Sequence, residues 1–164
     1  MLLDAAVGAL VSTEIDRRLS EAISGADAAE RSAALAEALT DLAPQTLPLG
    51  RKIVRLTVDA ADRPGSGRGH RRVAWIEKAL EPLCHTLSEE QYARLVSALS
   101  LVIGWEAMIV LRDVRGLSPD EEKAVTTWAA RVLVEAMVAE GHDQQPRSGR
   151  RRSKAPAARH KTTE

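Results

Sequence analysis

The sequence contains no phenylalanine and few aromatic residues of any kind. One tyrosine and three tryptophans account for the aromatic content, 2 % of 164 residues. The volume of a hydrophobic core must therefore come from leucine, valine, isoleucine and alanine. Because leucine and alanine are strong helix formers, this composition favours an all-helical fold.

Cysteine is also nearly absent, and no segment has the character of a signal or a membrane span. The single Cys84 excludes a disulfide within the chain, which fits a reducing compartment. Asp4 interrupts the first apolar residues and no basic segment precedes them, so a secretory signal is not predicted. The longest weakly charged run, residues 95–110, is too short and too polar to cross a bilayer. We therefore expect a cytoplasmic protein.

Net charge is zero, because 23 lysines and arginines balance 23 acidic residues. The two ends of the chain nevertheless differ. Residues 142–164 contain seven basic and two acidic residues, whereas residues 1–141 contain 16 basic and 21 acidic ones. The terminal segment also lacks apolar periodicity. We expect one helical domain at residues 1–141 and a disordered basic tail at residues 142–164.

Apolar residues spaced three and four apart predict an antiparallel bundle of about six helices. The expected ranges are 2–23, 27–42, 49–61, 70–86, 89–114 and 119–140. In the third range Ile53 and Val54 also suit a strand, but no partner strand appears elsewhere. Pro44 and Pro48 predict a break before that helix, and Pro82 predicts a kink or an early end in the next one.

Local signals mark several helix ends. Three pairs have the spacing of a capping box: Asp27 with Glu30, Ser88 with Gln91, and Ser118 with Glu121. Gly141 is expected to end the last helix, and residues 62–69 (DRPGSGRG) are expected to form a loop. Because only residues 115–117 separate the last two helices, these should fold back as an antiparallel hairpin.

The last two predicted helices are apolar on more than one side. A surface helix of a monomer needs a single apolar stripe, so a second stripe requires a second partner. A second copy of the chain related by a two-fold axis would supply it, and the alternative is a central helix in a monomeric bundle. The candidate interface residues are Leu101, Trp105, Met108, Trp128, Val132 and Met137.

The segment LSLVIGWEAMIVLRDVRGLSPDEEKAVTTWAARVLVEAM, residues 99–137, resembles the last two helices of the TetR family of transcriptional regulators. The resemblance rests on Gly104 and Glu106 within an apolar helix, the run LRDV at 111–114, the run GLS at 116–118 and Trp128 followed by alanine. Residues 2–22 resemble the connecting helix that follows the DNA-binding head of that family. The middle of the chain matches only in its order of helices and loops.

This resemblance implies a homodimer built on the last two helices and a pocket for a small apolar effector among the central ones. In that family, effector binding shifts the connecting helix and changes the spacing of two helix-turn-helix heads, which releases DNA. Here Met1 stands where the head would end. An internal methionine taken as the start, a truncated gene and a naturally head-less protein are the alternatives. DNA is expected as a partner only where a head is supplied upstream.

Four residues are candidates for the effector pocket: Trp75, Trp105, Glu106 and Met108. Glu106 shares its predicted helical face with Val102, Ile103, Ile109 and Val110, where a carboxylate must be paired. No cation lies three or four residues from it, so its partner should come from another helix, another subunit or a ligand. Large apolar side chains of this kind are equally typical of an ordinary core.

No constellation predicts catalysis, a metal or a cofactor. Cys84 and His85 are adjacent and would point about 100° apart on a helix, and the remaining histidines lack chelating spacing. The glycines within 65–69 fit neither a dinucleotide fingerprint nor a Walker loop. The acids at 120–122 are explained by the dipole of the helix they begin. We expect a protein that is not an enzyme.

The basic tail gives the alternative function. Its arginines and lysines can contact nucleic-acid phosphates without sequence preference, although no aromatic residues are interleaved for base stacking. Under this hypothesis the chain is a head-less helical module that binds a partner protein, or nucleic acid through its tail.

Overall fold

The computed structural model describes residues 13–18, 20–21, 27–58 and 70–144. Within these ranges it contains α2 (Ala28–Asp41), α3 (Ala43–Val58), α4 (His70–Ala79), η1 (Glu81–Leu83), α5 (Glu89–Val102), α6 (Trp105–Ile109), η2 (Val110–Val114) and α7 (Pro119–Gln144). These ranges hold no strand, which confirms the all-helical prediction, including the helix over Ile53 and Val54. The predicted loop at 62–69, most of the first helix and the tail beyond residue 144 lie outside them.

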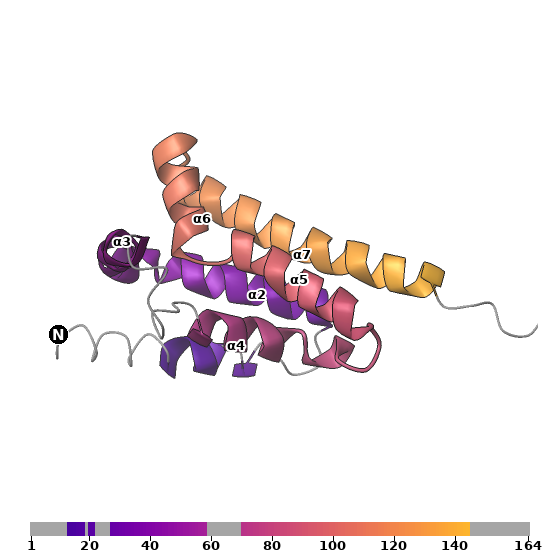
Figure 1. The fold of residues 1–164 in the computed structure, drawn as a ribbon. Helices are drawn as coiled ribbons and strands as arrows, with labels where there is room; N and C mark the ends of the chain where they lie inside the picture. Colours follow the sequence, from indigo (N-terminus) through magenta and orange to yellow (C-terminus); the bar gives the residue numbers. More distant parts are fainter. Residues whose placement is uncertain (1–12, 19, 22–26, 59–69, 145–164) are drawn as a thin grey trace, which may run out of the picture.

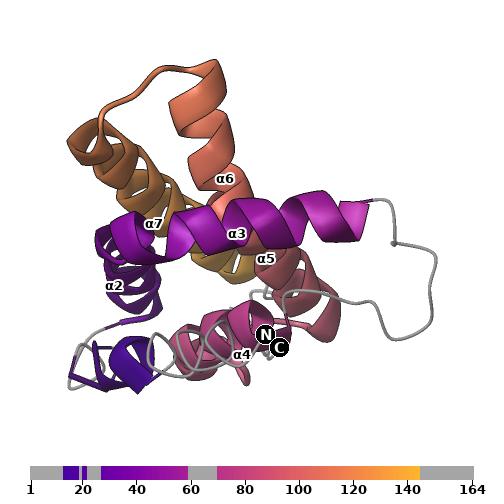
Figure 2. The ribbon, with the colours of Figure 1, turned by 90° about the vertical axis from the view of Figure 1, so that its left-hand side faces the viewer.

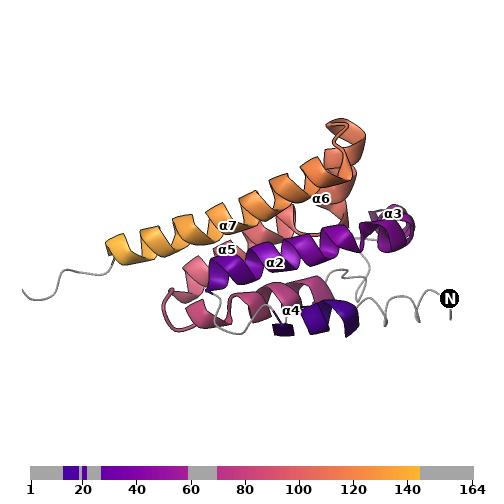
Figure 3. The same cartoon turned by 180° about the vertical axis from the view of Figure 1, so that it is seen from behind.

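Helices α2, α4, α5 and α7 lie side by side as a bundle (Figure 1). Helix α2 packs between α7 and α4, which Figure 3 shows from behind. It runs antiparallel to α7: Thr40 Oγ1 lies 3.4 Å from Thr126 Oγ1 near one end, and Arg131 pairs with Glu30 at 3.0 Å near the other. Helix α3 crosses the end of this bundle on its outside (Figure 2).

Buried apolar side chains form two clusters of unequal size. The main cluster joins α2, α4, α5 and α7, and its fully buried members include Leu35, Ile76, Leu80, Leu95 and Leu99. The small cluster joins α3 to α6 around Ala43, Leu47 and Met108, with Leu39, Trp105 and Ile109 packed against it. Leu39 of α2 contacts both clusters, so it links the bundle to the crossing helix.

The predicted capping signals are present. The Asp27 side chain accepts a 2.9 Å hydrogen bond from the Glu30 backbone N–H. Ser88 and Gln91 exchange hydrogen bonds as a complete capping box. The fourth helix ends early at Ala79, and Pro82 lies in the short η1 helix that follows.

The predicted break at Pro44 and Pro48 is wrong. Helix α3 begins at Ala43 and continues through Pro48. Pro44 stands in the first turn, where a helix has no use for the missing N–H. Pro48 leaves only the Pro44 carbonyl without its intrahelical donor. Both prolines are exposed, so water can reach that carbonyl.

The prediction that Gly141 ends the last helix is also wrong. Helix α7 continues to Gln144, past the expected boundary at residue 141. A Cβ atom at Gly141 would lie 3.1 Å from Cδ2 of the buried Leu87. The glycine therefore gives Leu87 room to pack beside α7 and does not act as a stop.

The tract Glu89–Val114 meets the length and composition of a membrane-crossing helix, which the shorter run at 95–110 did not suggest. No other helix in the described ranges does so. However, the chain changes direction within this tract at Ile103 and Gly104, so it does not form one straight rod. The cytoplasmic location stays a prediction.

Candidate functional site

The α6 arm, residues 105–114, rises away from the bundle where one continuous helix is predicted (Figure 1). Ile103 is extended, and Gly104 has φ 132° and ψ −177°, a conformation open essentially to glycine alone. A Cβ atom at Gly104 would lie 2.1 Å from Nη1 of Arg72. The predicted helix over 89–114 is therefore wrong. Glycine permits the turn, and the Arg72 side chain occupies the space beside it.

Arg72 also binds the arm directly. Its Nη1 lies 2.5 Å from Oε2 of Glu106, which ties α4 to α6. The prediction that Glu106 takes a partner from another helix is confirmed. Its predicted apolar surroundings are wrong, because Val102 and Ile103 precede the turn and Glu106 is partly exposed.

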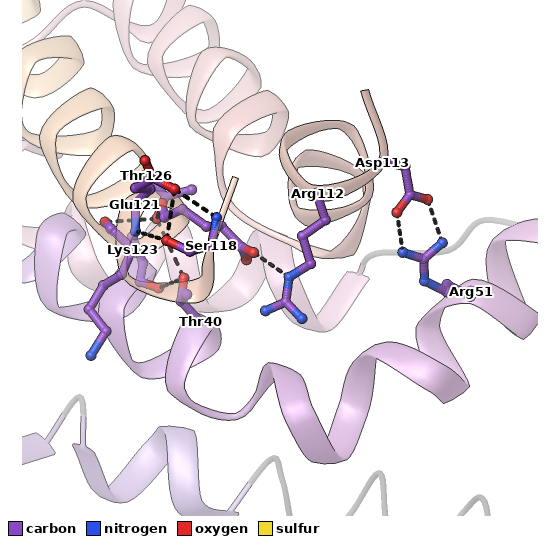
Figure 4. A network of polar contacts seen from close by, with 10 residues as sticks. Thr40, Arg51, Arg112, Asp113, Ser118, Glu121, Lys123 and Thr126 are labelled. Carbon is purple, nitrogen blue, oxygen red and sulfur yellow. Dashed lines mark hydrogen bonds and ion pairs between the residues drawn. The ribbon is translucent and has the colours of Figure 1, made fainter. Parts of the chain in front are cut away.

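The second half of the arm is the wide π-helical turn η2. Its backbone bonds span more residues than those of an α-helix: the Arg115 N–H donates to the Val110 carbonyl at 3.2 Å. Such turns redirect side chains and recur at functional sites. Arg112 and Asp113 consequently reach two different helices (Figure 4).

Asp113 pairs with α3. Arg51 donates hydrogen bonds from both terminal nitrogens to its two carboxylate oxygens, at 2.5 and 2.6 Å. Figure 4 shows the two side chains facing each other. The hydrogen bond from Arg51 lowers the pKa of Asp113 below its ordinary value, so the pair persists into mildly acidic solution and is lost as the pH falls further.

Arg112 pairs with the fully buried Glu122 of α7. The helix-dipole interpretation of Glu122 is therefore incomplete, because this acid stands inside the fold. Its position carried a signal: Glu122, Thr126, Ala130 and Val134 recur every four residues, and all four are buried. Within the described ranges, Oε1 of Glu122 and Nη2 of Arg112 have no hydrogen-bond partner.

The four predicted pocket residues divide between the two apolar clusters. Trp75 packs against the main cluster, and its Nε1 donates to Asp16 at 3.0 Å. Trp105 and Met108 belong to the small cluster, next to Glu106 on the arm. The Trp105 ring lies so close to Gly50 that a Cβ atom there would be 2.4 Å from it. The arm thus brings three of the four together and leaves Trp75 apart.

The six predicted interface residues also divide. Leu101 is 78 % exposed, Trp128 is 63 % exposed, and Val132 is exposed as well. Met108 and Met137 are buried in the chain's own core, and Trp105 is half-buried against α3. The surface reading therefore survives for Leu101, Trp128 and Val132, and the other three side chains pack within the monomer.

Together these exposed side chains form a surface, here called the outer face: Leu101 of α5 with Val125, Trp128, Val132 and Ala136 of α7. None of its members is charged. Arg94, early in α5, pairs with Glu140, late in α7, at 2.5 Å, as expected for antiparallel neighbours. At 1.5 Å per residue, this register places Leu101 at about the level of Val132.

Comparison with known proteins identifies no relative of this chain: no family model, no curated protein and no solved structure matches it.

Proposed function

We propose that the chain is the dimerising, effector-sensing core of a transcriptional regulator of the TetR type. Under this proposal, DNA is contacted by a helix-turn-helix head supplied upstream. The observation that carries the proposal is the outer face, because it gives α7 a second apolar surface after its first is buried against α2 and α5. The sequence resemblance supports it over the same two helices.

A second copy of the chain is the occupant that the outer face fits best. Two such faces related by a two-fold axis would bring four helices together and place apolar side chains of both copies opposite one another. Tryptophan near the centre of a contact is a frequent hot spot, and Trp128 has exposed valines one turn away on either side.

The α6 arm is the proposed sensing element. It is attached to α3, α4 and α7 by three arginine–carboxylate pairs, two of them partly or wholly buried. An effector that contacts the arm differently in two positions would shift the balance between them. Because α6 begins directly after α5, such a shift would be transmitted to the dimerising hairpin.

Replacing Leu101 by aspartate should dissociate the dimer. The carboxylate would have to be buried without a partner in the interface, which we expect to raise the dimer dissociation constant about thirtyfold or more. Sedimentation equilibrium over a range of protein concentrations measures this constant.

The matched control is Leu56→Asp, because Leu56 is similarly exposed, at 72 %, but lies on α3. Its dissociation constant should equal that of the unmodified chain. A monomeric unmodified chain, or equal weakening by both substitutions, would contradict dimerisation through the outer face.

A further inference from the structure

The outer end of α3 holds a basic hollow that the proposed dimer does not use. It has a volume of about 410 Å³ and is lined by Arg51, Lys52, Arg55 and Leu56. The helix crosses the end of the bundle and presents this stretch on the outside of the molecule (Figure 2). No acidic residue occurs from Ala43 to Val58 to offset the three cations from within the helix.

The charges of the hollow are only partly compensated. Asp113 neutralises Arg51 through its two hydrogen bonds. Lys52 and Arg55 are exposed, and neither takes part in an ion pair within the described ranges. The hollow therefore presents two uncompensated positive charges, beside a third that is held in place by its partner.

The same hollow has an apolar side. Leu56 is exposed, and the methylene stems of the arginines and the lysine are apolar along their length. Its volume falls within the range of small-molecule sites, about 300–1,000 Å³. A ligand that fits must then carry both an anionic group and an apolar body.

We propose that this hollow binds a phosphate monoester with an aliphatic chain. A phosphate monoester carries about two negative charges at neutral pH, which matches Lys52 and Arg55, whereas a carboxylate would balance only one. Arginine and lysine are the usual phosphate ligands. The chain would lie against Leu56.

A single-stranded nucleic acid fits the hollow less well. Such sites add aromatic side chains on which bases stack, and none of the four lining residues is aromatic. The hollow lies one turn beyond Gly50, against which Trp105 packs, so occupancy is positioned to influence the α6 arm. This proposal deepens the proposed function by naming the effector class, and it rests on that function for its regulatory meaning only.

The test is calorimetric titration of the full chain with monooctyl phosphate at low and moderate salt. We expect saturable binding that weakens with salt, no saturable binding of octanol and much weaker binding of inorganic phosphate. The double substitution Lys52→Gln with Arg55→Gln should weaken monooctyl phosphate binding about tenfold or more. Lys78→Gln with Arg115→Gln removes the same charges at exposed sites outside the hollow and should leave the affinity unchanged.

Three results would overturn the proposal: equal affinity in the two double variants, equal affinity for inorganic phosphate, or binding only to vesicles containing phosphatidic acid and not to monooctyl phosphate. Repeating the titration with Leu101→Asp separates this proposal from the preceding one. Binding by a monomeric variant would support the hollow, whatever the outer face proves to do.

Discussion

Substituting alanine for Gly104 is expected to lower the free energy of unfolding by about 3 kcal/mol or more. Two costs combine. An alanine is strained at φ 132°, and its Cβ would overlap the Arg72 guanidinium at 2.1 Å. The variant must either move Arg72 away from Glu106 or abandon the turn between α5 and α6. Urea denaturation followed by circular dichroism measures the loss.

Gly116 supplies the control for this effect. It also has a positive φ, 68°, but a Cβ atom there would meet nothing within 4 Å. Gly116→Ala should therefore cost only the left-handed backbone penalty, about 1–2 kcal/mol. Adding Arg72→Ala to Gly104→Ala should not restore full stability, because the backbone strain remains. Equal losses for Gly104→Ala and Gly116→Ala would mean that Arg72 does not restrict this turn.

Removing the buried carboxylate of Glu122 should cost about 3–5 kcal/mol. Glu122→Ala leaves the Arg112 guanidinium without its counter-charge and opens a cavity in the face of α7 that packs on α2. The expected result is a lower urea midpoint with an unchanged slope, measured in the same denaturation experiment.

The double substitution Arg112→Met with Glu122→Leu isolates the charge from the shape. Apolar residues of similar size often replace a buried ion pair without loss, so the double variant should be more stable than Glu122→Ala. Asp113→Ala breaks the neighbouring exposed pair and should shift the midpoint only slightly. If Glu122→Ala shifted the midpoint no more than Asp113→Ala did, the buried pair would not stabilise the fold.

Helix positions could be predicted from the sequence because their signals are local. Asp27, Ser88 and Ser118 each cap a helix through atoms three residues away, so a few consecutive letters hold the whole interaction. The helical nature of residues 49–58 followed from the absence of any partner strand. These features depend on nearest neighbours and on periodicity, both of which a single chain displays.

The turn at Gly104 could not be predicted in the same way. Apolar residues continue across it with helical spacing, from Leu99 and Ile103 to Met108, so the pattern itself shows no interruption. The reason for the turn lies in Arg72, which precedes Gly104 by 32 positions and belongs to another helix. Periodicity describes one helix at a time and is silent about which distant side chain occupies the space beside a glycine.

The candidate site was predicted in part for a related reason. Exposed and buried apolar side chains look alike in sequence, so Leu101 and Trp128 were grouped with Met108 and Met137, which the core encloses. The acid Glu122 was assigned to a helix terminus because its charge suggested the surface. Its partner Arg112 precedes it by ten residues, across the connection between η2 and α7.

The division of the core into two clusters sets an order for partial opening of the native state. Helix α3 and the α6 arm meet through a small set of apolar side chains, whereas α2, α4, α5 and α7 share the large one. Amide groups in α3 and α6 should therefore exchange with solvent through local openings that leave the bundle folded. The segment placed to respond to a ligand is thus the segment that moves at the lowest free-energy cost.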